Sequence, residues 1–243
     1  MGLQLPSPRY IHPDFWELER FLGPSFQLNW CNALDEKGHE ESQKYPSNED
    51  FLRNSLIFVY QSIGLSAAGI HRPYLAELLK ATADRCPCSV IDYGSGGGQD
   101  GLALHTLGYK VSFADIHSFS LMFLLWRLKE RRLDLPVYML DFSEEIPKHD
   151  IAICFDVVEH LAPDEQLRLF HRLMDVANCA FVNLIRGDGS ELNGLHFAVD
   201  AEHLTKYIGD HWKVWHKDYY PDDGGGYKQR LIVFGDTLEM AEG

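Results

Sequence analysis

Short apolar runs alternate with stretches of helical periodicity in the second part of the chain. The runs at residues 90–93, 110–114, 137–140, 151–155 and 180–185 have the length and apolar content of buried strands. Between them, apolar residues recur every three or four positions, as on the buried face of a helix. Strands that alternate with helices pack as a parallel sheet covered by helices. The pattern therefore predicts an α/β fold with helices on both faces of a mostly parallel sheet.

Two further strand-like runs follow, at residues 212–215 and 230–234. They come after a helical pattern around Leu204 and Ile208 and are separated by the glycine-rich segment 221–226. A short turn without a helix joins antiparallel strands. We therefore expect a seven-stranded sheet whose last strand is antiparallel.

The first 85 residues are rich in aromatic side chains and show helical rather than strand patterns. Residues 35–47 are polar and predict a loop. Residues 47–50 (Ser-Asn-Glu-Asp) have the spacing of a capping box before a helix, and a second helix starts near Pro73. We expect a helical and loop-rich cap over residues 1–85 and a sheet domain over residues 86–243. The cap either packs against the sheet or forms a lid over substrate.

The composition is that of an ordinary globular protein, with 45% hydrophobic and 24% charged residues. The formal charge is −14, from 22 basic and 36 acidic residues. Such a chain repels polyanions unless the fold builds a basic patch, and the basic cluster at 129–132 is interpreted as a solvated helix end. We therefore expect a small-molecule substrate and no nucleic-acid partner.

The five cysteines are scattered, and Cys86 and Cys88 have the wrong spacing for a zinc knuckle. No stretch near the start resembles a signal peptide. The most apolar segment, residues 119–126, is too short to cross a membrane. It is either covered by the amino-terminal helices or forms a homodimer interface. These features predict a cytoplasmic protein with no membrane partner.

The candidate chemistry begins where the first strand ends. An apolar run ends in Asp92 and leads into a turn with Gly94, Gly96 and Gly98, followed by a helical pattern. Glycine lets the backbone approach a ligand closely, and a helix start offers unpaired N–H groups. This arrangement predicts a nucleotide-binding turn; an ordinary strand-to-helix connection is the alternative.

The spacing of this turn distinguishes between cofactors. The dinucleotide fingerprint needs its third glycine where this chain has Gln99. The pattern Asp92-x-Gly-x-Gly-x-Gly instead resembles motif I of the class I S-adenosylmethionine (SAM) methyltransferases. The resemblance implies that SAM is the cofactor and that Asp92, the three glycines and Ser95 hold it. An NAD-dependent oxidoreductase is a competing interpretation.

Acidic residues also follow the second, third and fourth predicted strands. Asp115, followed by Ile116, lies at a strand tip from which a carboxylate can accept both ribose hydroxyls. The resemblance implies that Asp141 binds the adenine amino group, that the backbone of Phe142 meets the adenine ring, and that Asp156 lies at the methionine half. We expect all of them at the carboxyl edge of the sheet. Solvated strand-end acids are the alternative.

Residues 156–161 (Asp-Val-Val-Glu-His-Leu) resemble a segment common in the ubiquinone- and menaquinone-biosynthesis type of small-molecule methyltransferase. The resemblance to the family spans about residues 88–235 and implies a Rossmann-like sheet. It also implies methyl transfer to an oxygen, nitrogen or carbon nucleophile of a small metabolite. The first ~65 residues match no family and are expected to shape substrate choice. The alternative to an enzyme is a non-catalytic protein that binds SAM or acts as a scaffold for partners.

Two histidines are candidates for the general base that an oxygen or nitrogen nucleophile needs. His160 follows the fourth strand and His196 follows the fifth, and the pKa of an imidazole lies near working pH. His71, His117 and His203 are weaker candidates. Any of them can instead simply hydrogen-bond a loop.

The same histidines, together with nearby acidic residues, are also candidate ligands for a metal ion. Asp156-x-x-Glu159-His160, with His196 downstream, resembles the metal-binding pattern of small-RNA 3′-terminal 2′-O-methyltransferases, in which two acids and two histidines hold a divalent ion. These side chains suit Mg²⁺ or Mn²⁺. The acidic total charge, and an Asp where that family has its first Glu, favour a site without metal.

Overall fold

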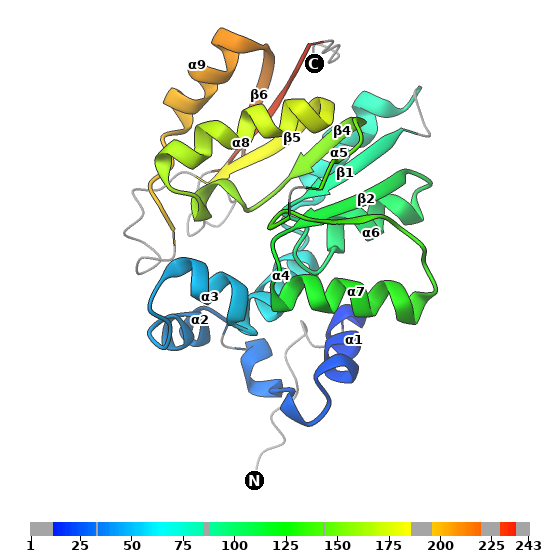
Figure 1. The fold of residues 1–243 in the computed structure, drawn as a ribbon, viewed down its shortest axis with the longest axis vertical. Coiled ribbons are helices and arrows are strands. Elements are labelled where there is room, and N and C mark those ends of the chain that lie inside the picture. Colours follow the sequence, from blue (N-terminus) through cyan, green and yellow to red (C-terminus); the bar gives the residue numbers. More distant parts are fainter. Residues whose placement is uncertain are drawn as a thin grey trace.

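The computed structural model describes residues 12–32, 34–84, 88–142, 144–185, 196–219 and 229–236. These residues form a seven-stranded sheet with the order β3-β2-β1-β4-β5-β7-β6 (Figure 1). The strands are β1 (Ser89–Tyr93), β2 (Lys110–Asp115), β3 (Val137–Met139), β4 (His149–Cys154), β5 (Ala177–Ile185), β6 (Lys213–Tyr219) and β7 (Gln229–Gly235).

The strand directions confirm the predicted α/β sheet. Strand β1 pairs in parallel with β2 and β4, and β3 and β5 extend the parallel part on either side. Strand β7 alone is antiparallel to its neighbours β5 and β6 among the described strands. The glycine-rich segment 221–226 lies outside the described residues.

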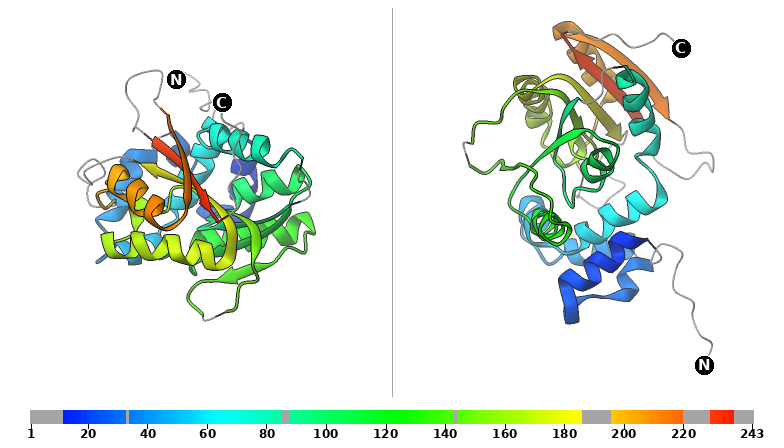
Figure 2. Two further views of the ribbon diagram at one scale, coloured as in Figure 1. Left: turned by 90° about the horizontal axis from the view of Figure 1, so that it is seen from above. Right: turned by 90° about the vertical axis from the view of Figure 1, so that its right-hand side faces the viewer.

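Helices cover both faces of the sheet, because successive residues of a strand point to opposite sides. Val90 and Phe113 pack with one group of helices, and the adjacent Ile91 and Ala114 pack with the other. Figure 2 shows the two helical layers on opposite sides of the strands. The first group is α5 (Arg72–Thr82), α6 (Gln99–Thr106) and α7 (Phe119–Arg131), and the second is α8 (Pro163–Val176) and α9 (Ala201–His211).

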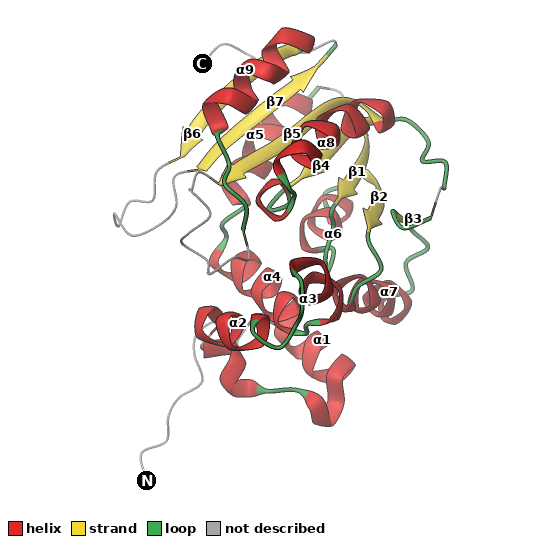
Figure 3. Ribbon diagram, turned by 60° about the vertical axis from the view of Figure 1, so that its left-hand side comes forward, coloured by secondary structure: helices red, strands yellow, loops and turns green. Residues whose placement is uncertain are grey.

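The amino-terminal helices build a third hydrophobic core, which includes Phe15, Ile57 and Ile63 and reaches Phe123 of α7. They lie beneath the carboxyl ends of β1 and β2 (Figure 3). The division into a cap and a sheet domain near residue 85 stays a prediction, and α5 itself packs on the sheet through Tyr74. The helices are α1 (Pro13–Leu22), α2 (Leu34–Ser42), α3 (Asn48–Asn54) and α4 (Ile57–Ala68), with 3₁₀ turns at Gly23–Ser25 and Leu28–Asn32.

The apolar helix α7 is partly covered by these helices. Phe21 packs against Phe123 and Trp126, with ring centroids 5.4 and 5.8 Å apart. Met122 and Leu125 remain about two-fifths exposed. None of the helices in the described ranges is long and apolar enough to span a bilayer.

The prediction of a loop over residues 35–47 was wrong, because α2 occupies most of that segment. The helix is held by close packing on α4 rather than by an apolar stripe. A Cβ on Gly64 would lie 2.4 Å from Leu34 Cδ1, and a Cβ on Gly38 would lie 2.8 Å from Gln61 Nε2. The predicted N-cap after it is confirmed, since Ser47 Oγ accepts a hydrogen bond from the Asp50 N–H at 3.1 Å.

A buried arginine joins the amino-terminal helices to the glycine turn. Arg127 of α7 is 1% exposed and donates to Asp14 Oδ1, to Glu17 Oε2 and to the carbonyl oxygen of Gly97, each at 2.7 Å. The ion pairs compensate the arginine charge that burial would otherwise penalise. The position of α1 and the shape of the turn are therefore coupled through one side chain.

Replacing this arginine should destabilise the whole fold. In Arg127→Met, Asp14 and Glu17 lose a buried partner, and we expect the free energy of unfolding to fall by about 3–5 kcal/mol in chemical denaturation. Arg168→Met is the control, because Arg168 pairs with Asp164 and Glu165 on the exposed face of α8 and should cost about 1 kcal/mol or less. Equal losses in the two variants would contradict a structural role for the buried cluster.

Candidate cofactor and active site

The turn between β1 and α6 has a left-handed backbone at three of its glycines. Gly94, Gly96 and Gly98 have φ values of 76°, 51° and 74°. The Gly94 N–H donates to the carbonyl oxygen of Ala114 on β2 at 2.8 Å, and the Gly98 N–H donates to that of Ser95 at 2.7 Å. The turn is thus fixed by its own hydrogen bonds and by the neighbouring strand.

The three glycines serve different purposes. A Cβ on Gly94 would lie 2.4 Å from Val157 Cγ2, and one on Gly98 would lie 2.5 Å from Leu124 Cδ1, so both permit close packing. A Cβ on Gly96 would meet no atom of the described residues within 4 Å. Beside it, the buried Oγ of Ser95 has no hydrogen-bond partner among the described residues. Open space and an unpaired hydroxyl both fit a ligand that lies against this turn.

Asp115 lies at the end of β2 and faces the turn. Its Oδ2 accepts from the Gly96 N–H at 2.5 Å, and its Oδ1 accepts from the Ile116 N–H at 2.7 Å. Burial raises the pKa of Asp115 to about 6, although these two hydrogen bonds favour the charged form. These two hydrogen bonds therefore position the carboxylate beside the open glycine.

Asp141, after β3, is paired with the cap. Arg53 of α3 donates to its two carboxylate oxygens at 2.7 and 3.0 Å, and the His117 N–H donates to Oδ2 at 2.5 Å. The hydrogen bond from Arg53 lowers the pKa of Asp141. The adjacent Phe142 is 60% exposed. Adenine recognition by these two residues stays a prediction.

Asp92 is hydrogen-bonded to the first turn of α6. Its Oδ2 accepts from the Gly101 N–H of α6 at 2.9 Å, and the residue is 5% exposed. Burial, followed by the charge of Asp100, raises the pKa of Asp92 well above its usual value. The residue thus joins β1 to the first turn of α6, and its predicted contact with cofactor is not tested by this geometry.

Asp156, after β4, sits in a polar network. It has a φ of 54°, in the left-handed region that non-glycine residues rarely adopt. Asn183 of β5 holds it on both sides: Asn183 Nδ2 donates to Asp156 Oδ1 at 2.6 Å, and the Asp156 N–H donates to Asn183 Oδ1 at 2.7 Å. The other carboxylate oxygen contacts His71 Nε2 at 2.8 Å, and His71 Nδ1 contacts Asp100 Oδ2 at 2.6 Å.

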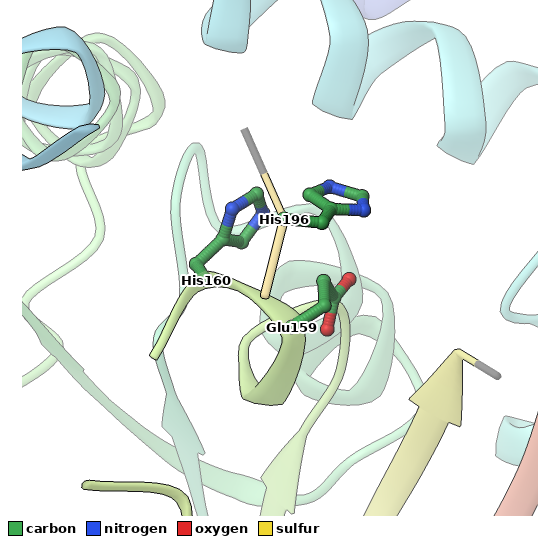
Figure 4. A group of neighbouring side chains, drawn as sticks. All are labelled: Glu159, His160 and His196. Carbon is green, nitrogen blue, oxygen red and sulfur yellow. The ribbon is translucent and has the colours of Figure 1, made fainter. Parts of the chain in front are cut away.

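The two candidate catalytic histidines meet each other, and Glu159 joins them. Glu159 and His160 belong to the 3₁₀ turn η4 (Val158–His160), and potential ligand atoms of Glu159, His160 and His196 lie within 4.8 Å of one another (Figure 4). The rings of His160 and His196 are edge to face, with centroids 4.7 Å apart. Phe58 of α4 packs edge-on against His160 at 5.8 Å. The cap therefore borders this cluster directly.

The pKa values of His196 and Glu159 are shifted from their usual values. Burial, with a smaller effect from His160, lowers the pKa of His196 to about 3. Burial, with a smaller effect from Asp156, raises the pKa of Glu159 to about 8, and its Oε2 has no hydrogen-bond partner in the described part of the chain. A neutral His196 is a poor match for a general base at neutral pH, because proton transfer works best when the pKa lies near that pH.

Several residues of this site carry no sequence signal that identifies them. His71 counts only as a weaker candidate from sequence, and Arg53 lies on an ordinary polar helix. Asn183 does have a signal, because it is a single polar residue within the apolar run of β5 and is fully buried. Glu159 is found from sequence only through the metal-binding pattern.

No known family profile matches the sequence, and no curated protein matches it. Solved structures do share its fold. ChlM, the magnesium protoporphyrin IX methyltransferase from Synechocystis PCC 6803 with bound S-adenosylhomocysteine (SAH), matches with a TM-score of 0.59 at 16% identity, over 84% of this chain and 97% of that chain.

Two further structures extend the comparison. A SAM-dependent methyltransferase from Clostridium acetobutylicum has a TM-score of 0.56 at 10% identity, over 71% of this chain and 98% of that chain. The methyltransferase domain of bacterial CtHen1 has a TM-score of 0.53 at 17% identity, over 70% and 99%. The chain therefore has the Rossmann-like fold of the class I SAM-dependent methyltransferases.

The open side of Gly96 gives a test of the turn. Gly96→Ala fills the open space and strains the backbone at a φ of 51°, so we expect the affinity for SAM to fall about tenfold or more. Gly108→Ala is the matched control, since Gly108 also has a positive φ and open surroundings but ends α6 away from the turn. Calorimetric titration should show weaker binding only in the first variant, and a similar loss in both would assign the effect to backbone strain.

Proposed function

We propose that this chain is a SAM-dependent methyltransferase that acts on a small metabolite. One observation carries the proposal: the parallel strands β1 to β4 each lead into a carboxylate at one edge, around a glycine turn with open space. The solved structures that share the fold include methyltransferases crystallised with SAM or SAH. SAM supplies an activated methyl group on a sulfonium, and the protein must align the acceptor with it and exclude water.

The geometry suggests how the chain would hold this cofactor. Asp115 would accept the ribose hydroxyls, with Ile116 beside it, and the Gly96 side of the turn would face the adenosyl group. Ser95 Oγ would gain the partner that it lacks in the described residues. Asp141 and Phe142 would lie at the adenine end, and Asp156 at the methionine end.

The acceptor would bind between the histidine cluster and the cap, where Phe58 borders His160. An aromatic side chain at this position suits an apolar or aromatic metabolite of the kind handled by the ubiquinone- and menaquinone-biosynthesis type. His160 would take the proton from an oxygen or nitrogen nucleophile. His196, neutral because of its low pKa, would accept a hydrogen bond instead.

The remaining expectations also stay proposals. The acidic charge of −14 supports a small-molecule partner over a polyanion. Cys31 and Cys154 are free thiols, which supports a reducing compartment such as the cytoplasm. The exposed Met122 and Leu125 of α7 support a homodimer.

Binding of SAM and its pH dependence test the function. The carboxylate of Asp115 is the acceptor, so affinity should be full above its pKa of about 6 and fall about tenfold between pH 7.5 and pH 5 as the group is protonated. Asp115→Asn should weaken binding at pH 7.5 and remove most of this pH dependence. Titration with NAD under the same conditions is the control, and tight NAD binding without SAM binding would overturn the proposal. Release of SAH during a metabolite screen would then identify the acceptor.

A second candidate function is a divalent-metal-dependent 2′-O-methyltransferase that acts on RNA. The observation that favours it is the convergence of Glu159, His160 and His196, with a buried carboxylate oxygen that has no partner among the described residues. A neutral imidazole and a carboxylate are ligands for Mn²⁺, which would polarise an acceptor hydroxyl.

Metal binding separates the two candidates without an activity assay. If the cluster holds a metal, Mn²⁺ titration followed by electron paramagnetic resonance should show one site, and Glu159→Gln should weaken it by about tenfold or more. His203→Asn, a change on the exposed face of α9, should leave it intact. If Mn²⁺ binds no more tightly to the wild type than to Glu159→Gln, the metal-dependent candidate is excluded.

A further inference from the structure

His71 spans the crevice between β1 and β4 at the carboxyl edge of the sheet. The chain leaves β1 toward β2 on one side and returns to β4 on the other, so the strand order reverses here, and open α/β sheets bind ligands in such a crevice. Asp100 belongs to α6, which follows β1, and Asp156 follows β4. The ring nitrogens of His71 reach one carboxylate on each side, at 2.6 and 2.8 Å.

The backbone fixes the position of this imidazole. Helix α4 ends at Gly69, whose φ of 73° turns the chain sharply into α5, and His71 is the residue before α5 begins. The ring packs against Tyr74 and Phe155, with centroids 6.0 and 5.3 Å away, and its side chain is only 13% exposed. The imidazole is thus held in place by packing as well as by its two hydrogen bonds.

His71 is also the cation that faces this group of carboxyls. Burial alone would lower its pKa, but the charges of Asp156 and Asp100 and their hydrogen bonds raise the pKa of His71 well above its usual value. Its charge in turn favours the ionised forms of Asp92 and Glu159. An imidazolium donates from both nitrogens, which matches the two carboxylate contacts.

The topology indicates which part of a cofactor would lie here. Asp115 ends β2, and Asp156 follows β4, on the opposite side of β1. A ligand whose ribose lies at Asp115 and which crosses the glycine turn would bring its other end to the crevice at Asp156. For SAM, that end is an amino acid with its own carboxylate.

We propose that His71 is a positioning residue for the amino-acid end of the cofactor, an inference that rests on the proposed function. Its doubly bonded imidazolium fixes the separation of Asp100 and Asp156 across the crevice. It also cancels part of their negative charge, so that a ligand carboxylate is accepted beside them. The adenosyl end, held near Asp115, does not depend on it.

His71→Gln tests whether only the amino-acid end of the cofactor depends on His71. Glutamine keeps one hydrogen-bond donor but removes the charge and the second donor. We expect affinity for SAM and for SAH to fall about tenfold or more in calorimetry. Affinity for 5′-methylthioadenosine, which has the adenosyl thioether but no amino acid, should change less than about threefold. His203→Gln, an exposed histidine on α9, is the matched control.

The outcomes separate the inference from the proposed function. If the wild type binds none of these ligands, the proposed function fails. If it binds them and His71→Gln weakens all three equally, or none, the positioning role is overturned. A second variant, His71→Gln with Asp100→Asn, removes one of the uncompensated carboxylates and should recover part of the SAM affinity. Further loss in this double variant would also overturn the role.

Discussion

Carboxyl groups crowd the carboxyl ends of β1 to β4, and these four strands supply no lysine or arginine at those ends to balance them. Asp115 and Glu159 have raised pKa values because burial penalises their charged forms. The cations that balance this edge come from outside the sheet: Arg53 from α3 and His71 from the turn before α5. Segments that precede the first strand therefore favour the ionised forms of Asp141 and Asp156.

Because cations of the amino-terminal segment pair with carboxylates at the sheet edge, the charges of these two parts of the chain depend on each other. Asp141 and Asp156 have lowered pKa values because Arg53 and His71 reach them, and each of these pairs joins residues far apart in the sequence. Phe58 of α4 adds an apolar contact to the same edge at His160. A cap that supplies both charge and apolar surface can influence cofactor binding and acceptor binding together.

The positions of the strands along the chain and the glycine turn after β1 could be predicted from the sequence because both depend on local patterns. The apolar runs that became β1 to β7 have strand length, and the turn needs glycine at a positive φ. Helix α2 could not be predicted, because it is held by two glycines that permit contact with α4 and not by an apolar stripe. The contacts of His71 with Asp100 and Asp156 could not be predicted for a related reason. Ion pairs between distant segments produce no periodic pattern in the sequence. The strand-end acids were found, but not their partners.

The contact between Arg127 and the Gly97 carbonyl has a consequence for how such a protein can diversify. An enzyme whose substrate-binding segment is independent of its cofactor turn can exchange that segment by recombination and keep its chemistry. Here the carboxylates of α1 hold the arginine that braces the turn. A grafted amino-terminal segment would have to bring equivalent acids with it, because otherwise the arginine that braces the turn would lose its partners.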